Sequence, residues 1–162
     1  MSKLSPGEKA PAFDLPADSG KNAALKDYAG KFLVLYFYPR DNTPGCTREA
    51  QAFTKLASDF KKAGAEIAGV SKDSVASHGA FREKHFPARR DRPKVALLSD
   101  PDLAVHQAYG AFGEKVMYGK KVKGVIRSTF LIDPKGKLVR SWSSVKVDGH
   151  AEAVLEVLRA QS

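Results

Sequence analysis

The segment from Lys31 to Tyr38 constrains the fold of this chain more than any other. It is an almost unbroken apolar run, and Gly30 and Pro39 bound it. An apolar run without polar alternation is typical of a strand buried on both faces, as in the centre of a parallel sheet. The segment therefore predicts a central strand.

The segments after this run alternate between helical and strand patterns. From Thr47 to Lys62 apolar residues recur at three- and four-residue spacing, which predicts an amphipathic helix that ends near Gly64. The later elements that we expect are a strand over 65–71, a helix from an Asp73 cap to about His85, a short strand over 95–98, a helix that starts at 99–101 and stops at Gly110, a hairpin of strands 125–132 and 137–142, and a last helix capped by Asp148.

This order of elements indicates an α/β fold with a central mixed β-sheet flanked by helices. A β-α-β unit followed by two antiparallel strands and a terminal helix resembles the thioredoxin-like plan. The part before Lys31 is expected to be an N-terminal extension with short strands around residues 12–15. With 162 residues and no repeat or linker, we expect a single domain over residues 1–162.

The chain is basic, with a formal net charge of +9. The densest positive segment spans residues 82–94 and contains two prolines, so we interpret it as a solvated loop after a helix, with a docking patch for an acidic partner as the alternative. No recognition helix, zinc finger or RNA-binding aromatic motif accompanies it, and we expect no nucleic-acid partner. His78 and His85 are too far apart for a pair of metal ligands, and we expect no metal and no cofactor.

Several features point to the cytoplasm. No apolar run reaches the ~18 residues that span a membrane, and we expect no membrane association. The first eight residues contain no apolar signal segment. The single cysteine cannot form an internal disulfide, which fits a reducing compartment. We therefore expect a cytoplasmic protein.

That single cysteine, Cys46, follows the apolar run after a turn rich in Pro, Asp, Asn and Gly, at the start of the predicted helix. A thiol on the first helical turn lies near free backbone N–H groups and the positive end of the helix dipole. Such surroundings favour the thiolate, which is the reactive form. Pro39, Thr43 and Cys46 form the pattern Pro-x-x-x-Thr-x-x-Cys, and its position between strand and helix indicates a reactive thiol.

At this point the chain resembles the peroxiredoxins, most closely the bacterioferritin-comigratory or Q-type branch. The resemblance extends from residues 7–13 (GEKAPAF) to residues 127–133 (RSTFLID) and the final helix. It implies that Cys46 is the peroxidatic cysteine, with the Thr43 hydroxyl beside it and Pro39 shielding the pocket. It also implies that Arg127 is the active-site arginine and that Glu49 orients it.

The chemistry fits these roles, because cleavage of a peroxide O–O bond needs a thiolate and stabilisation of the charge on the departing oxygen. Each residue also has a structural interpretation. Cys46 could be a small buried hydrophobe, Thr43 a helix N-cap, Pro39 a strand end, Arg127 an edge-strand surface residue and Glu49 an ordinary acid of the first turn.

The chain departs from the family where many members carry a resolving cysteine. Gln51 stands at one such position, and Arg82 lies near the other. We therefore expect a one-cysteine mechanism, in which a Cys46 sulfenic acid is reduced by an external thiol such as thioredoxin, glutaredoxin or glutathione.

The expected function is a thiol-dependent peroxidase that reduces hydrogen peroxide and organic hydroperoxides. The alternatives are a redox sensor that relays oxidation to a partner and, with less support from the residues, a basic nucleic-acid or chaperone-type binding protein. A disulfide reductase is disfavoured because no Cys-x-x-Cys is present. The resemblance implies a monomer or weak homodimer.

Overall fold

The computed structural model describes residues 4–90 and 93–161. Its centre is a five-stranded sheet in the order β5-β4-β3-β8-β9. β3 pairs in parallel with β4 and antiparallel with β8, so the sheet is mixed, as predicted. The strands are β3 (Phe32–Phe37), β4 (Ala65–Ser71), β5 (Ala96–Ser99), β8 (Ser128–Ile132) and β9 (Leu138–Trp142).

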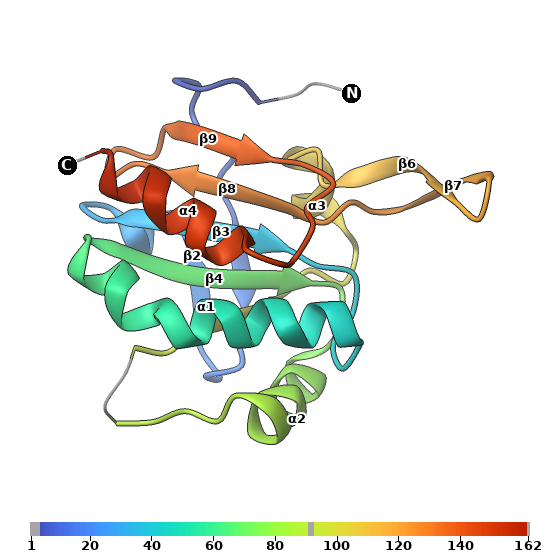
Figure 1. The fold of residues 1–162 in the computed structure, drawn as a ribbon, viewed down its shortest axis with the longest axis horizontal. Helices are drawn as coiled ribbons and strands as arrows, with labels where there is room; N and C mark the ends of the chain where they lie inside the picture. The colour runs from blue at the N-terminus through green and yellow to red at the C-terminus, as the bar shows by residue number, and fades with distance from the viewer. Residues whose placement is uncertain (1–3, 91–92, 162) are drawn as a thin grey trace.

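Helices and short elements cover both faces of this sheet (Figure 1). On one face lie the long helices α1 (Pro44–Lys62) and α4 (His150–Arg159), with α2 (Val75–His85) beside them near β5. The other face is covered by the N-terminal extension and by the segment around α3. The elements in these two segments are β1 (Asp14–Pro16), β2 (Asn22–Ala24), the 3-10 helix η1 (Leu25–Tyr28) and α3 (Ala104–Ala108).

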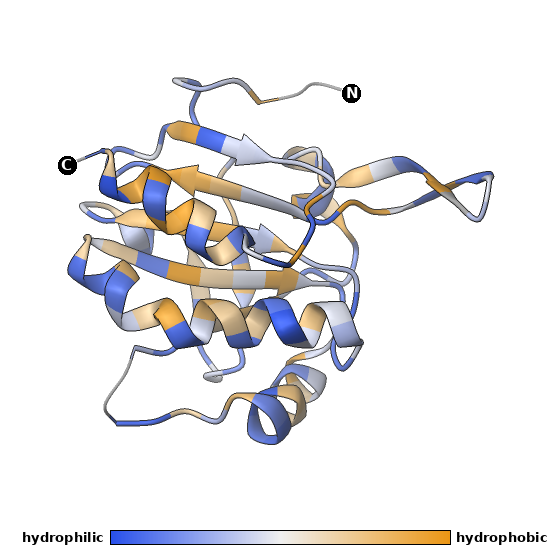
Figure 2. Cartoon of the chain, in the orientation of Figure 1, coloured by the Kyte–Doolittle hydropathy of each residue, from blue (hydrophilic) through white to orange (hydrophobic). Residues whose placement is uncertain are grey.

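Strand β3 explains why the apolar run carries no polar alternation. Val34 and Tyr36 pack into the cluster under α1 and α4, whereas Leu33, Leu35 and Phe37 pack into the cluster on the opposite face. All five side chains are fully buried. Both layers that cover the sheet therefore pack against apolar side chains from this one strand. The strands of the sheet are among the most hydrophobic parts of the ribbon (Figure 2).

A close approach between Tyr36 and Gly69 fixes the register of β3 against β4. These two residues are direct partners in the parallel ladder. The Tyr36 ring stacks on Phe53 of α1 with 4.8 Å between ring centroids. A Cβ atom at residue 69 would lie 2.6 Å from the Tyr36 ring, so only glycine leaves room for it there.

The starts of three helices differ from the sequence prediction. Ser74, not Asp73, caps α2, because its Oγ accepts a hydrogen bond from the N–H of Ser77 at 3.1 Å. Asp73 instead accepts from the N–H of Asp41 at 2.8 Å. The helix expected from residue 99 begins only at Ala104, and the last helix has Gly149 rather than Asp148 at its N-cap.

The strand predicted over residues 125–132 is divided in two. A hairpin of β6 (Phe112–Met117) and β7 (Lys120–Val125), which the sequence prediction missed, projects from the body, and β8 starts only at Ser128. Arg127 therefore lies in the connection between β7 and β8 and not within a strand. The sequence prediction missed the hairpin because its strands contain many lysines and a glycine and carry little apolar alternation.

No helix in the described part of the chain is long and apolar enough to span a lipid bilayer.

Candidate active site

Cys46 lies where the central strand gives way to the longest helix. β3 ends at Phe37, the chain turns, and α1 begins at Pro44 with Thr43 in extended conformation at the N-cap. Proline is favoured at this first helical position because its missing N–H would find no partner within the helix. Cys46 thus occupies the first turn, as predicted, and only 1% of its surface is exposed.

Arg127 joins the cysteine to a buried carboxylate. One terminal guanidinium nitrogen donates to Sγ of Cys46 at 3.3 Å, and the other donates to Oε1 of Glu49 at 2.6 Å. Gly45 permits this approach, because a Cβ there would lie 3.3 Å from Nη2 of Arg127. The structure therefore brings Cys46, Arg127 and Glu49 together from α1 and from the connection before β8. The sequence analysis did not single out Gly45, although a glycine in a first helical turn is a signal, since it weakens the helix.

The site stabilises the charged form of Arg127 but not that of Glu49. Burial lowers the pKa of Arg127, but Glu49 and Cys46 together raise it above its ordinary value, so the guanidinium stays charged. Burial raises the pKa of Glu49 to about 7, although Arg127 acts in the opposite direction. Oε2 of Glu49 is buried without a hydrogen-bond partner, which is the local reason that the carboxylate is poorly stabilised. Arg127 is therefore the group of this site that stays charged, and its guanidinium lies beside the sulfur.

Thr43 and Pro39 lie on the turn that leads to the sulfur. The hydroxyl of Thr43 donates to the carbonyl of Arg40 at 2.9 Å, and its own carbonyl accepts from the N–H of Thr47 at 2.9 Å. The hydroxyl does not cap the helix. Because its proton is engaged in the turn, the Thr43 oxygen can still accept a hydrogen bond from another group. Pro39 is half-buried and lies two residues after the end of β3.

A buried network fixes the turn from behind. Asp41, in the turn, accepts hydrogen bonds from Tyr38 Oη at 2.6 Å, from Ser77 Oγ at 2.8 Å and from His78 Nδ1 at 2.8 Å. The other ring nitrogen of His78 faces the carbonyl oxygen of Leu98 at 2.9 Å. Both nitrogens of His78 therefore meet acceptors, and only the protonated ring can donate to both.

The electrostatics of His78 agree with this arrangement. Burial alone lowers the pKa of His78, but the hydrogen bond and charge of Asp41 and the carbonyl of Leu98 raise it above its ordinary value. From the sequence, His78 was considered only as a metal ligand and rejected, and Asp41 was not considered. A histidine on the apolar side of a helix was the available signal, but nothing local identified its partner.

His150, at the start of α4, is a neutral neighbour of the site. Burial and the charge of Arg127 lower its pKa to about 4. Its Nε2 lies 2.7 Å from Oγ1 of Thr129. Among the described residues no group of three or more His, Cys, Asp or Glu side chains could hold a metal ion.

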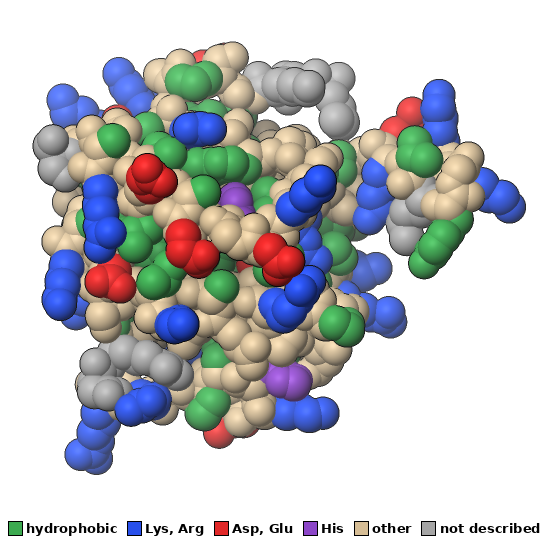
Figure 3. All heavy atoms as spheres, in the orientation of Figure 1, with side chains coloured by type: hydrophobic (Ala, Val, Ile, Leu, Met, Phe, Trp, Pro, Cys, Tyr) green, Lys and Arg blue, Asp and Glu red, His purple; other side chains and the backbone are tan. Residues whose placement is uncertain are grey.

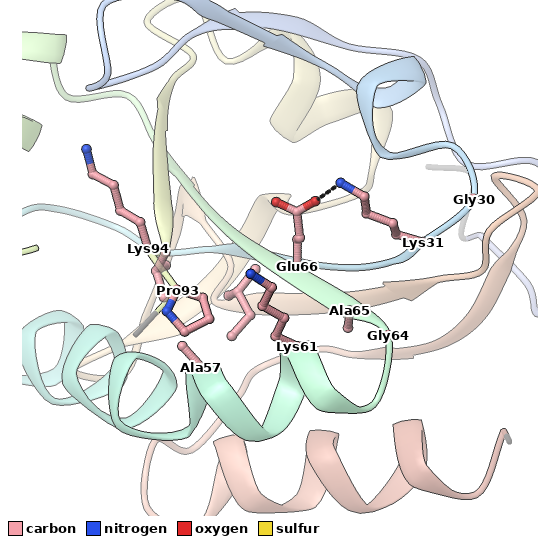
Figure 4. Close-up of a pocket in the computed structure, with 11 residues that line it drawn as sticks. Gly30, Lys31, Ala57, Lys61, Gly64, Ala65, Glu66, Pro93 and Lys94 are labelled. Atoms are coloured by element: carbon pink, nitrogen blue, oxygen red, sulfur yellow. Dashed lines mark hydrogen bonds and ion pairs between the residues drawn. The ribbon is translucent and has the colours of Figure 1, made fainter. Parts of the chain in front are cut away.

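A separate pocket of about 500 Å³ is lined by residues that do not include the cysteine, and Figure 4 shows these residues. Its walls include Lys31, before β3, and Ala65, the first residue of β4. Cys46 follows the opposite, carboxyl end of β3, so the pocket and the cysteine lie at different ends of the sheet. Lys31 and Glu66 form an ion pair at its rim, with Lys61 and Lys94 nearby. The pocket therefore has no part in the chemistry of the sulfur.

Comparison with known proteins connects this fold and site to one family. Residues 6–141 match the AhpC/TSA family. Peroxiredoxin Bcp of Xanthomonas campestris is 48% identical over 158 residues, which cover 94% of this chain and 93% of that protein. Peroxiredoxin Bcp of Bacillus subtilis is 42% identical, with 96% of both chains covered.

Solved structures agree with these relatives. Peroxiredoxin Q of Xanthomonas campestris superposes with a TM-score of 0.83 at 48% identity, covering 91% of this chain and 90% of the other. A cysteine-to-serine variant of PrxQ from Xylella fastidiosa superposes with a TM-score of 0.88 at 39% identity, with 99% of both chains covered.

A thioredoxin-like sheet that carries a single cysteine on the first turn of a helix, with an arginine against its sulfur and no Cys-x-x-Cys, agrees with the class of thiol-dependent peroxidases to which these relatives belong. The chain belongs to the AhpC/TSA family, as a peroxiredoxin of the Bcp or Q type. The fold and the family expected from the sequence are both confirmed, and the single cysteine agrees with the expected lack of a resolving cysteine.

Proposed function

We propose that Cys46 attacks the peroxide and that the reaction follows a one-cysteine mechanism. The Cys46 thiolate forms a bond to one peroxide oxygen while the O–O bond breaks. The electron pair of that bond leaves with the second oxygen, which takes a proton and departs as water or an alcohol. Cys46 becomes a sulfenic acid. The single observation that carries this proposal is the 3.3 Å contact between the Arg127 guanidinium and Sγ.

The remaining residues have positioning or binding roles in this proposal. Arg127 contacts the sulfur and then faces the charge that develops on the departing oxygen. Glu49 holds one side of the guanidinium fork, so that the other side stays directed at the sulfur. Thr43 accepts a hydrogen bond from the peroxide O–H, and Pro39 shields the reacting sulfur from water.

The substrates in this proposal are hydrogen peroxide and organic hydroperoxides. The chain has one cysteine, so the sulfenic acid cannot form an intramolecular disulfide and an outside thiol must reduce it. Thioredoxin, glutaredoxin and glutathione are the candidate donors. We further propose that the chain works in the cytoplasm as a single domain, either as a monomer or as a weak homodimer.

Mass spectrometry and turnover together test this function. One equivalent of peroxide should add the mass of one oxygen to the native chain, and nothing to the Cys46→Ser variant. The native chain should then consume peroxide over many turnovers with dithiothreitol, whereas the variant should not. A stable intermolecular disulfide as the main product would contradict the one-cysteine scheme, and oxidation without turnover would favour a sensor.

A further inference from the structure

The β6–β7 hairpin is the most conspicuous surface feature of the molecule that the proposed chemistry leaves unused. It projects from the body on the side where β3 ends and α1 begins (Figure 1). All three large hydrophobic side chains reported as exposed among the described residues belong to this hairpin, namely Val116, Tyr118 and Val122. Hydrophobic and basic side chains gather on the projecting arm in the space-filling view (Figure 3).

Tyr118 at the tip of the arm is held in an unusual conformation. Its φ is 52°, followed by 79° at Gly119, and its side chain is 98% exposed. Two successive positive φ angles match the type I′ turn, which favours Asn or Gly at the first position. A bulky residue rarely adopts this conformation, and here no packing of the ring in the chain explains it. Tyrosine is among the residue types that dominate the binding energy of protein interfaces.

The positive charge of the arm favours an acidic partner. Lys120, Lys121 and Lys123 are exposed on β7, and the only acidic residue of the two strands is Glu114. Two copies of this arm would bring like charges together, which opposes self-association. An acidic surface with a small apolar depression would complement both the lysines and the tyrosine.

The base of the arm leads directly to the sulfur. β7 ends at Val125, and the connection that follows contains Arg127, whose guanidinium contacts Cys46. Each strand of the arm has six residues, so the tip lies about 20 Å from the base. A small protein of roughly 30 Å diameter can therefore touch the tip and still present a group to the active site.

We propose that the β6–β7 hairpin is the docking arm for an acidic dithiol protein that reduces oxidised Cys46. The inference rests on the proposed one-cysteine function, which requires such a donor. In the first step a donor thiol attacks the sulfenic sulfur, an S–S bond forms and water leaves. In the second step the other thiol of the donor attacks the donor sulfur that is bonded to Cys46. This releases Cys46 as a thiol and leaves the donor with an internal disulfide.

The matched variants are Tyr118→Asn, Lys121→Glu and Lys135→Glu. Tyr118→Asn removes the aromatic ring and creates the Asn-Gly pair that the turn prefers, so the hairpin keeps its shape. Lys121→Glu reverses one charge on the arm. Lys135→Glu is the control, because this exposed lysine lies in the turn after β8, at the end of that strand away from Arg127.

Steady-state peroxide turnover is measured with two donors, dithiothreitol and an acidic bacterial thioredoxin. With thioredoxin we expect the KM for the donor to rise at least 10-fold for Tyr118→Asn and about 5-fold for Lys121→Glu, and to stay unchanged for Lys135→Glu. Added salt should raise the KM of the native chain for thioredoxin, and raise it less for Lys121→Glu. With dithiothreitol, both arm variants should turn over at the native rate.

The two donors separate failure of this inference from failure of the proposed function. Suppose that the native chain turns over with dithiothreitol. If the arm variants then have no effect with thioredoxin, or if thioredoxin does not reduce the protein at all, the docking arm alone is overturned. No turnover with dithiothreitol would instead overturn the peroxidase scheme and with it this inference. Sedimentation of the native chain as a dimer that Tyr118→Asn dissociates would also overturn it, because the arm would then be a self-association surface.

Discussion

At the scale of single residues, the arginine beside the sulfur has two simultaneous partners. The planar fork of Arg127 donates to Cys46 with one nitrogen and to Glu49 with the other. A lysine has the charge but not the fork, so it cannot hold both partners in fixed geometry. The direction of the guanidinium therefore matters as much as its charge.

The variant Arg127→Lys tests this geometry. We expect the rate constant of Cys46 with hydrogen peroxide to fall about 100-fold, the size of effect seen when one preorganised donor is lost. Stopped-flow measurement of peroxide consumption gives the rate constant. Arg140→Lys, an exposed residue of β9, is the control. A change of less than a few-fold for Arg127→Lys would show that charge alone suffices.

The raised pKa of Glu49 gives a pH dependence of stability. Its pKa rises from 4.5 to about 7 on folding, so its contribution to stability is complete below 4.5 and is lost as the pH rises through 7. The unfolding free energy of the native chain minus that of Glu49→Gln should therefore decrease across this window. Urea denaturation at several pH values measures it, with Glu152→Gln on exposed α4 surface as control. A difference that does not vary with pH would contradict the assignment.

At the scale of elements, the turn before Cys46 depends on helix α2 and strand β5. Asp41 on the turn, His78 on α2 and the Leu98 carbonyl on β5 form one buried chain of hydrogen bonds. This chain of hydrogen bonds thus joins three segments that are far apart in the sequence. Its contribution requires a protonated His78, so it is lost as the pH rises through the raised pKa of the histidine.

Removal of one member of this pair should be costly. We expect His78→Gln to lower the unfolding free energy by about 3 kcal/mol, because a buried Asp41 charge loses its partner. His85→Gln on the same helix is the control, since His85 is only partly buried. Urea denaturation at neutral pH measures both variants. Equal stability of the two would mean that the pair contributes nothing net.

The contact between β3 and β4 gives a second test at this scale. Gly69→Ala should lower the unfolding free energy by about 1–3 kcal/mol, because its Cβ would overlap the stacked Tyr36 ring. Gly79→Ala in α2 meets no neighbour and should raise stability by about 0.5–1 kcal/mol. Thermal denaturation of both variants measures the contrast. Destabilisation by Gly79→Ala, or none by Gly69→Ala, would contradict the packing described for β3.

At the scale of the whole molecule, the described surface offers little for stable self-association. Its reported exposed large hydrophobics lie on one narrow, basic arm, whereas a stable homodimer interface has an extended apolar core. We therefore expect sedimentation velocity to show a monomer at micromolar concentration, with no shift on tenfold dilution. A dimer that persists on dilution would contradict this expectation.

Local patterns in the sequence determined much of the architecture. The apolar run predicted β3 buried on both faces, and three- and four-residue spacing predicted α1, because each pattern reflects the burial of neighbouring residues along one element. The same local reasoning placed Cys46 on a first helical turn. It failed at helix starts where two capping residues compete, as at Asp73 and Ser74, since tertiary hydrogen bonds decide between them.

Only the tertiary structure decided how distant groups meet. The family resemblance placed Arg127 at the active site, but its contact with a sulfur 81 positions away and the pairing of Asp41 with His78 depend on the assembled fold. Periodicity carries no information about such contacts, because hydrogen bonds between separate elements depend on how the layers are assembled. The projecting arm was missed for a related reason: apart from its base at Val125, most residues of its strands are exposed or only partly buried, so burial imposed little alternation on their sequence.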